Sequence, residues 1–339
     1  MRGAGCALGL LLASILLVAC ATASGSEGGP PAPPAVTASV PEPAAPAVVM
    51  RLRAPFAPPP IQTTSPPPPS LSAEGAVVLD EGSGAVLYER NAHTPLAPAS
   101  VTKIMTALIA LERGNPEDLV TVQIDSRRMR GSTVMGLVPD EQLTLQDLLY
   151  GMMLPSGNDA AAAIAEHIAG TQAAFVELMN RHAEVLGLLN THFANPHGLD
   201  ATGHYSSAYD LALLAREAMA RPDFQRLVNA RYWEAQGTIN SYRMFNSNAL
   251  LTWYSGADGV KIGYTRSARQ TIVASATRDG HRVYAVALRS PDRNFDASVL
   301  LSWAFNAYSW RAGGEAGAGL DGSAISASTS ALTAGAAAP

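Results

Sequence analysis

The sequence predicts an α+β fold, with a central antiparallel sheet covered by helices and an all-helical insertion. Strand-like runs lie at both ends of residues 71–311 and helical patterns fill the middle, so the sheet is built from both ends of this segment. All 4 tryptophans and all 10 tyrosines also lie there, which makes it the part of the chain able to form a core. We therefore predict one folded domain over residues 71–311.

The domain is predicted to begin with a β-hairpin followed by a helix. Two apolar runs, Ala76–Asp80 and Ala85–Glu89, are joined by a Glu-Gly-Ser-Gly turn, which is a hairpin signal. Apolar residues at helical spacing then follow Ser100 and end at Gly114, where a glycine favours termination.

Helices are predicted for the middle of the domain, and a second hairpin and a closing helix for its end. The expected middle helices cover residues 144–153, 159–168, 175–186 and 209–219. Residues 270–276 and 282–288 are strand-like and flank an Asp-Gly turn. Residues 295–308 form the closing helix.

The first twenty residues are predicted to be an export signal. An apolar stretch of 15 residues, Cys6–Cys20, follows a positive start; it is too short for an ordinary membrane span and typical of a signal peptide. It ends in Leu-Val-Ala-Cys, which resembles a bacterial lipobox and marks Cys20 for lipidation. The alternative is an ordinary signal cleaved near residues 21–23, with Cys20 incidental.

Low-complexity flanks surround the domain. Residues 21–70 hold 15 of the 24 prolines and four charged residues. This composition predicts a disordered tether that cannot bury a core. Residues 312–339 contain no aromatic residue, lysine or arginine and are predicted to be a disordered tail.

Charge and cysteine content exclude several classes of function. The net charge of −5 argues against nucleic acid as a partner. The only two cysteines, Cys6 and Cys20, lie in the signal, so the domain has neither a disulfide framework nor a cysteine-ligated metal. Three histidines within residues 192–204 lack a zinc spacing, and we expect no metal and no cofactor.

Ser100 and Lys103 form the first candidate site. Residues three apart share a helix face, so the hydroxyl can meet the amine. A serine becomes a nucleophile when a base takes its proton, and burial can lower the pKa of a lysine enough for that task. The alternative is a helix-capping serine beside a surface lysine.

Two further candidate sites follow. Ser156 and Asn158 flank a glycine between two predicted helices and could relay a proton and bind a substrate carbonyl; the alternative is an interhelical turn. Lys261 and Gly263 lie in a predicted strand, where a glycine lets a ligand approach the backbone; the alternative is an edge strand protected by a lysine.

In this order, the three sites resemble the Ser-x-x-Lys, Ser-x-Asn and Lys-Thr-Gly motifs of penicillin-recognising serine enzymes. Residues 98–106 and 153–160, around the first two sites, and residues 191–200, between the second and third, are similar to those of low-molecular-weight penicillin-binding D-alanyl-D-alanine carboxypeptidases. The resemblance covers essentially residues 71–310. It implies a β-lactamase/transpeptidase-like fold in a bacterial cell-envelope protein.

The resemblance also implies roles for the site residues. Ser100 would attack the penultimate D-alanine of a peptidoglycan stem peptide, and Lys103 would be the general base. Ser156, with Lys261 as a second candidate, would pass the proton to the leaving D-alanine. Asn158 would hold the peptide, and the backbone amides of Ser100 and Tyr264 would bind the oxyanion. β-Lactams would acylate Ser100 covalently, and the lipid on Cys20 would anchor the protein to a membrane.

The sequence departs from the family where substrate carboxylate is bound. Ile262 replaces the threonine of Lys-Thr-Gly, between Lys261 and Gly263, and isoleucine cannot donate a hydrogen bond. Ser247 stands where better-known relatives carry an arginine. Arg266 and Arg269 lie nearby in sequence and could substitute, although surface arginines in a loop are the simpler interpretation.

Three other functions remain open. An endopeptidase acting on peptidoglycan cross-links would use the same residues without reading a free carboxylate. A class A β-lactamase would carry Ser-Asp-Asn and a Glu-x-x-Leu-Asn loop, which this sequence lacks. A non-catalytic peptidoglycan-binding lipoprotein would not need Ser100, Lys103, Ser156 and Asn158 intact.

Overall fold

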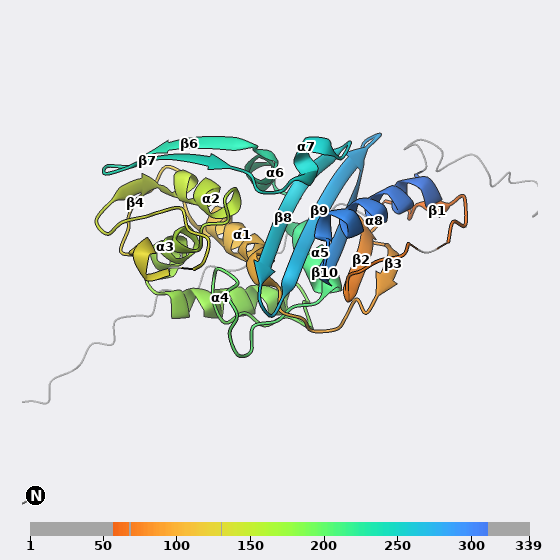
Figure 1. The fold of residues 1–339 in the computed structure, drawn as a ribbon, viewed down its shortest axis with the longest axis horizontal. Coiled ribbons are helices and arrows are strands. Elements are labelled where there is room, and N and C mark those ends of the chain that lie inside the picture. The colour runs from red at the N-terminus through yellow and green to blue at the C-terminus, as the bar shows by residue number, and fades with distance from the viewer. Residues whose placement is uncertain (1–56, 68, 130, 311–339) are drawn as a thin grey trace, which may run out of the picture. The chain divides into compact units, whose positions relative to one another are not determined.

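A five-stranded antiparallel sheet forms the centre of the computed structural model, which describes residues 57–310 except 68 and 130. The strand order is β3-β2-β10-β9-β8 (Figure 1). The strands are β2 (Gly75–Asp80), β3 (Val86–Arg90), β8 (Ala257–Thr265), β9 (Arg269–Arg278) and β10 (His281–Ser290). Two strands come from the start of the domain and three from its end, which confirms the predicted sheet.

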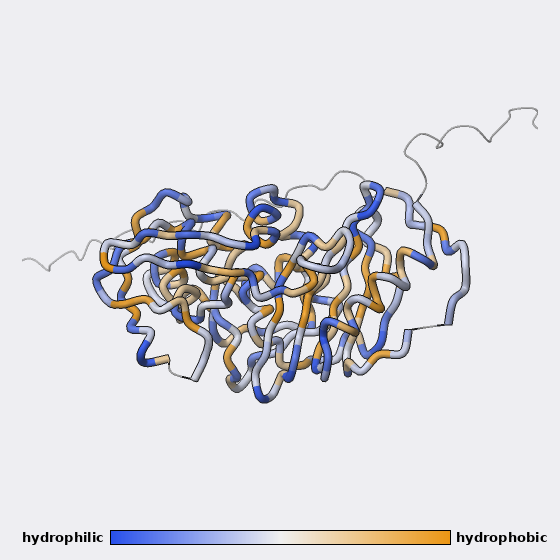
Figure 2. The backbone as a smooth tube through the Cα atoms, turned by 45° about the horizontal axis from the view of Figure 1, so that its top comes forward, coloured by the Kyte–Doolittle hydropathy of each residue, from blue (hydrophilic) through white to orange (hydrophobic). Residues whose placement is uncertain are grey.

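The sheet is buried on both faces because its side chains alternate. Val77 and Leu79 of β2 pack into the cluster beneath the main group of helices. Ala76 and Val78 of the same strand pack into a second cluster on the opposite face. A strand alternates its side chains with a period of two, so one apolar run supplies both clusters. Figure 2 shows hydrophobic stretches along the strands and hydrophilic ones at many of the turns.

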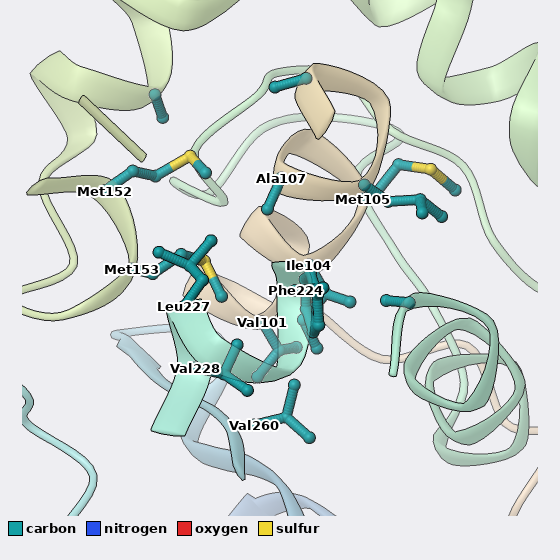
Figure 3. Close-up of a cluster of buried hydrophobic side chains, with 14 of the residues drawn as sticks. Val101, Ile104, Met105, Ala107, Met152, Met153, Phe224, Leu227, Val228 and Val260 are labelled. Carbon is teal, nitrogen blue, oxygen red and sulfur yellow. The ribbon is translucent and has the colours of Figure 1, made fainter. Parts of the chain in front are cut away.

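Helices cover both faces. The first cluster includes residues from α1 (Lys103–Arg113), α2 (Leu145–Met153), α3 (Asn158–Ala169), α4 (Gln172–Val185), α5 (Ala208–Ala218) and α6 (Pro222–Asn229). The second includes residues from α7 (Leu250–Trp253) and α8 (Arg293–Ala307). Figure 3 shows Val101 and Ile104 gathered with residues of α6 and with Val260 of β8. The turn and helix that hold Ser100 and Lys103 are thus packed against the edge of the sheet.

Side-chain caps set the start of several predicted helices. Thr144, Thr171, Ser207 and Asp292 each accept a hydrogen bond from the backbone N–H three residues later. A cap satisfies one of the four orphan amides of a helix and stabilises it by about 1 kcal/mol. The six predicted helices are confirmed, with boundaries shifted by up to three residues.

The insertion also contains strands that the sequence analysis did not predict. β4 (Leu119–Thr121) pairs with β5 (Gln142–Thr144), and β6 (Tyr232–Gln236) pairs with β7 (Ser241–Phe245). These strands have three to five residues. Such short strands depend on tertiary packing, here that of Trp233 stacked on Tyr150 of α2 at 3.9 Å between ring centroids.

The predicted boundary at residue 71 lies inside the described structure. Strand β1 (Ile61–Gln62), placed by the prediction in the tether, pairs with β11 (Tyr308–Ser309). Thr63 also donates its backbone N–H to the carbonyl of Ala307. The signal with Cys20, most of the tether and the tail lie outside the described residues. Among the described residues, no helix is both long and apolar enough to cross a membrane.

Candidate active site

A short turn presents the candidate nucleophile. Ser100 lies in a 3-10 turn, η1 (Ala99–Thr102), that runs directly into α1. Ala99 has φ of 54°, a left-handed backbone conformation that is uncommon for alanine. The Ala99 carbonyl lies against Gly198: a Cβ added at residue 198 would be only 2.0 Å from the Ala99 carbonyl oxygen. A side chain at residue 198 would therefore displace the turn that carries Ser100.

Lys103 lies beneath Ser100, as the three-residue spacing predicts. Its Nζ is 3.1 Å from Ser100 Oγ. It is 2.6 Å from both Asn158 Oδ1 and the backbone oxygen of His197. Lys103 is fully buried. The loss of hydration, together with the nearby charge of Lys261, lowers the pKa of the Lys103 amine well below its usual range.

The neighbouring carboxylate does not pair with this amine. Asp159 raises the pKa of Lys103 only as a lesser influence than burial and Lys261. Its two oxygens accept hydrogen bonds from four backbone amides, those of Met135, Gly136, Leu137 and Ala160. Asp159 is thereby occupied in holding residues 135–137 against α3. The oxygens bonded to Lys103 are all neutral, so none of them supplies the full negative charge that would offset the loss of hydration and keep its pKa high.

The second predicted motif lies between α2 and α3. Ser156 is buried and has φ of 72°. Asn158 begins α3, and its carbonyl oxygen is the acceptor for Lys103. In the part of the chain that is described, the Asn158 side-chain nitrogen makes no hydrogen bond. The asparagine thus orients the lysine with one end of its amide while the other end can still donate to a ligand.

Strand β8 brings the third motif to the site. Lys261 pairs with Val273 and so shares the sheet face that packs on the helices. It is buried, and its Nζ donates only a 3.2 Å hydrogen bond to the Ile262 carbonyl. Loss of hydration, with the charge of Arg293 nearby, lowers the pKa of Lys261 to about 7.

Gly263 permits the strand to approach the nucleophile. A Cβ there would lie 2.7 Å from the Ser100 backbone nitrogen and 2.6 Å from Thr271 Oγ1. Side chains larger than hydrogen do not fit at such distances, so glycine is required by contact rather than by backbone angle. The close approach puts the backbone that leads to Tyr264 beside the Ser100 amide. Two amides so placed are the donors that an oxyanion hole needs.

Ile262, predicted to contact substrate, lies on the opposite face of β8 from Lys261 and Gly263. It pairs with Ile272 and lies with it in the apolar cluster that also contains residues of α8. Only 8% of its surface is exposed. Its side chain is therefore mainly a core residue. The predicted contact between Ile262 and substrate stays a prediction, now confined to this small exposed fraction.

The structure adds an arginine that the sequence analysis missed. Arg293, the first residue of α8, donates from Nη1 to the Gly263 carbonyl at 2.8 Å. Its Nε is buried and has no partner within the described residues. Arg266 and Arg269, the arginines considered from sequence, are exposed at the turn after β8. The sequence signal nearest to this residue is the Asp292 cap, which marks the start of α8. It does not reveal the contact between Arg293 and Gly263, because the two residues are far apart in the sequence.

A loop from the insertion braces the whole site. Asn195 accepts from the amide of Gly198 and donates to the carbonyl of Leu199. The Thr106 hydroxyl of α1 donates to the carbonyl of Pro196, and Lys103 donates to that of His197. The loop is therefore bound to α1 through its backbone carbonyl oxygens.

The imidazole of His197 takes no part in these bonds to α1. It accepts a long, 3.3 Å hydrogen bond from the Leu199 amide. Burial and the charge of Lys103 lower its pKa to about 3. This geometry fits a structural role for His197. Within the described residues, no group of three His, Cys, Asp or Glu side chains could hold a metal.

Ser247 connects the β6–β7 hairpin to the second motif. Its amide and hydroxyl both donate to the Leu154 carbonyl, at 3.0 Å each. Leu154 lies two residues before Ser156. The residue that stands where better-known relatives carry an arginine thus makes a backbone contact in this chain.

Comparison with known proteins establishes the family. The family model for D-alanyl-D-alanine carboxypeptidases, peptidase family S11, matches residues 61–292. This chain is a member of that family. The recognition made from the three motifs is confirmed.

Curated carboxypeptidases extend the match across most of the described residues. The chain is 39% identical over 245 residues to a D-alanyl-D-alanine carboxypeptidase of Bacillus subtilis, and 38% over 260 residues to one of Escherichia coli. These alignments cover 70% and 72% of this chain, but 63% and 64% of the relatives. The carboxypeptidase-family chain thus spans somewhat less than two thirds of their length.

Solved structures confirm the predicted fold class. The Streptomyces K15 DD-transpeptidase is similar with a TM-score of 0.67 at 33% identity, over 70% of this chain and 98% of that one. Penicillin-binding protein 6B of Escherichia coli gives 0.66 at 37% identity, over 72% and 80%. The S11 member therefore shares their mixed fold, a central antiparallel sheet with helices.

The pKa values of both buried lysines can be measured directly, because Lys103 and Lys261 are the only lysines in the chain. Protein labelled with 13C at lysine Cε gives two side-chain signals, assigned with Lys103→Met. We expect Lys261 to titrate near pH 7 and Lys103 well below pH 10.5. Above its pKa each amine is neutral, and it gains a proton as the pH falls. In urea, where the protein is unfolded, both lysines should titrate near 10.4. The same pKa values in the folded protein as in urea would contradict the prediction.

Proposed function

We propose that this chain is a serine D-alanyl-D-alanine carboxypeptidase acting on peptidoglycan stem peptides. The observation that carries the proposal is the buried amine of Lys103 within hydrogen-bond distance of the Ser100 hydroxyl, with its pKa lowered by the loss of hydration. A lysine in this state can accept the proton that makes serine a nucleophile. The family to which the chain belongs supports the same chemistry.

Acylation follows from this arrangement. Ser100 Oγ forms a bond to the carbonyl carbon of the penultimate D-alanine while Lys103 takes the hydroxyl proton. The backbone amides of Ser100 and Tyr264 stabilise the resulting oxyanion; one such donor is worth about 3 kcal/mol. The peptide C–N bond then breaks, and the leaving D-alanine receives a proton through Ser156, with Lys261 as the neighbouring amine.

Deacylation restores the enzyme. Water attacks the ester carbonyl and gives its proton to Lys103, and the C–O bond to Ser100 breaks with return of a proton to the serine. A β-lactam presents a strained amide to the same serine, so it forms the same ester. The proposal therefore includes covalent inhibition by β-lactams.

Recognition of the terminal carboxylate is assigned to Arg293 in this proposal. Its guanidinium lies against the Gly263 carbonyl at the edge of the site, with Nε unpaired among the described residues. Arginine binds carboxylates through paired N–H donors. Lys261 adds a second cationic group when it is protonated.

Labelling with a fluorescent penicillin tests the nucleophile. We expect the protein to be labelled and to release D-alanine from a peptide ending in D-Ala-D-Ala. Ser100→Ala should abolish both because no ester can form, and Lys103→Met should lower the labelling rate by at least about 100-fold through loss of the base.

Ser298→Ala, at a half-buried serine of α8 whose hydroxyl donates only to the Phe295 carbonyl, is the matched control and should behave as the parent protein. Absence of labelling of the folded parent protein would rule out the catalytic proposal. Rapid turnover of the penicillin would instead support the β-lactamase alternative.

A D,D-endopeptidase acting on cross-links is the second candidate, and Ile262 favours it. A cross-linked peptide has no need of a hydroxyl beside the terminal carboxylate, and Ile262 provides none. The same nucleophile, base and oxyanion donors would serve this reaction. The two activities therefore differ only in what lies beyond the scissile bond.

Ile262→Thr distinguishes these candidates. A hydroxyl near Arg293 should lower the KM for peptides with a free terminal carboxylate about fivefold, as expected from one added hydrogen bond. Cleavage of cross-linked dimers should not improve. Ile272→Thr, at its buried strand partner, controls for the hydroxyl alone. Equal gains for both substrates, or none for the carboxylate substrate, would contradict this assignment.

We further propose that Cys20 is lipidated and holds the domain at the bacterial cell envelope. The support is the Leu-Val-Ala-Cys pattern at the end of the apolar segment. Residues 21–70, if extended, could reach about 150 Å from the lipid. Cys20→Ala in cells should shift the protein from the membrane to the soluble fraction and leave penicillin labelling unchanged. Retention of the variant in the membrane fraction would argue against the lipid.

A further inference from the structure

The outer face of the β6–β7 hairpin carries three exposed cross-strand pairs. Side chains alternate along both strands: Trp233, Ala235, Tyr242 and Met244 face inward, where Trp233 donates from Nε1 to Asp147 of α2. The outward residues are exposed at every position. They pair in register as Tyr232 with Phe245, Glu234 with Arg243, and Gln236 with Ser241.

The first pair is an aromatic platform. The rings of Tyr232 and Phe245 lie 4.8 Å apart between centroids. Their side chains are 40% and 65% exposed. Exposed aromatic surface is costly in water and gathers where a ligand with an apolar face is bound.

The other two pairs offer planar polar groups beside that platform. Arg243 and Glu234 form an exposed ion pair with 3.4 Å between Nε and Oε1, and such pairs contribute little to stability. Ser241 donates its hydroxyl to the Gln236 side chain. Aromatic rings next to guanidinium, carboxylate and amide groups suit a sugar, whose C–H face stacks on rings while its hydroxyls both donate and accept.

The aromatic end of the hairpin leads to the active site. Phe245 is followed by Asn246, which ties the ends of the two strands together: its backbone amide donates to the Arg231 carbonyl and its side chain donates to the Ala230 carbonyl. Ser247 then binds the Leu154 carbonyl, two residues before Ser156. Figure 1 shows the hairpin beside α2, α6 and α7, with β8 close to its base.

The distances suit a substrate that carries both peptide and sugar. An extended stem peptide of five residues spans about 16 Å. Each hairpin strand, at five residues, is also about 16 Å long. A stem peptide held at Ser100 therefore carries its sugar well beyond the nucleophile, and the bonds of Ser247 to the Leu154 carbonyl place the base of the hairpin next to the Ser156 motif.

We propose that the outer face of the β6–β7 hairpin binds the glycan strand of peptidoglycan through Tyr232 and Phe245. This inference rests on the proposed function, since it assumes that the stem peptide is the substrate. According to this inference, the hairpin makes the protein bind glycan-linked peptides more tightly than free ones. Ser100 and Lys103 act on the peptide alone and do not distinguish the two.

The test compares two soluble substrates that end in the same D-Ala-D-Ala pentapeptide, one free and one attached to a peptidoglycan tetrasaccharide. For the parent protein, we expect KM to be about fivefold lower for the glycan-linked substrate. Phe245→Ala and Tyr232→Ala should each remove this difference, with kcat and the free-peptide KM unchanged. Leu189→Ala, which alters an apolar residue that is 91% exposed elsewhere, should preserve it.

Conservative variants identify the interaction. Phe245→Tyr keeps a ring and should retain the preference, whereas Phe245→Leu keeps an apolar side chain and should lose it. Penicillin labelling of every variant reports that the site is folded. If labelling and free-peptide cleavage persist but the parent shows no preference for the glycan, this inference fails while the proposed function stands. Absence of labelling in the parent protein identifies failure of the proposed function itself.

Other occupants of the face give different results. Peptide-free glycan strands should compete with the glycan-linked substrate and leave cleavage of the free peptide unaffected. Sedimentation velocity should give the same molecular mass for the parent protein and Phe245→Ala. A mass that halves in the variant, without any glycan preference in the parent, would show the face to be a contact between two copies and would overturn the inference.

Discussion

The burial of the Lys103 amine without an ion-pair partner is the constraint on which the site depends. Removing a charged amine from water is strongly unfavourable, so the group becomes neutral unless a carboxylate compensates. Asp159 is near enough to do so, yet backbone amides occupy both of its oxygens. The acceptors that remain for Lys103 are a hydroxyl, an amide and a backbone carbonyl. None of these groups carries the negative charge that would offset burial, and together they hold the amine at the Ser100 hydroxyl.

Because side chains alternate along β8, the residues of the Lys261–Gly263 motif lie on two different faces of the sheet. Lys261 and Gly263 pair with Val273 and Thr271, so they face the helices and the nucleophile turn. Ile262 lies between them and faces the cluster that contains α8 residues. A change from threonine to isoleucine therefore extends a core without altering the face that meets Ser100. This separation explains how the chain can lose a hydroxyl beside Arg293 while the residues around the nucleophile are retained.

The sequence predicted those features that local pattern controls. The helices have apolar periodicity and caps such as Thr144 and Asp292, and the spacing of Ser100 and Lys103 needs only one helical turn. Arg293 could not be found in this way because its contact with Gly263 joins residues thirty positions apart. The β6–β7 hairpin was missed for a related reason: its inner face is fixed by the packing of Trp233 on α2.

The two lysines of the chain lie where a basic side chain must be able to lose its proton, and arginine supplies the other basic residues. Arginine supplies 21 of the 23 basic residues, and lysine only the two at this site. A guanidinium keeps its charge even when buried. It can pair with two carboxylates at a half-buried position, as Arg282 does with Asp258 and Glu81, but it cannot become a base. An ε-amine loses its proton when burial removes its hydration. Lysine is therefore required where a cation must be able to become neutral, and at such positions arginine is not an equivalent replacement.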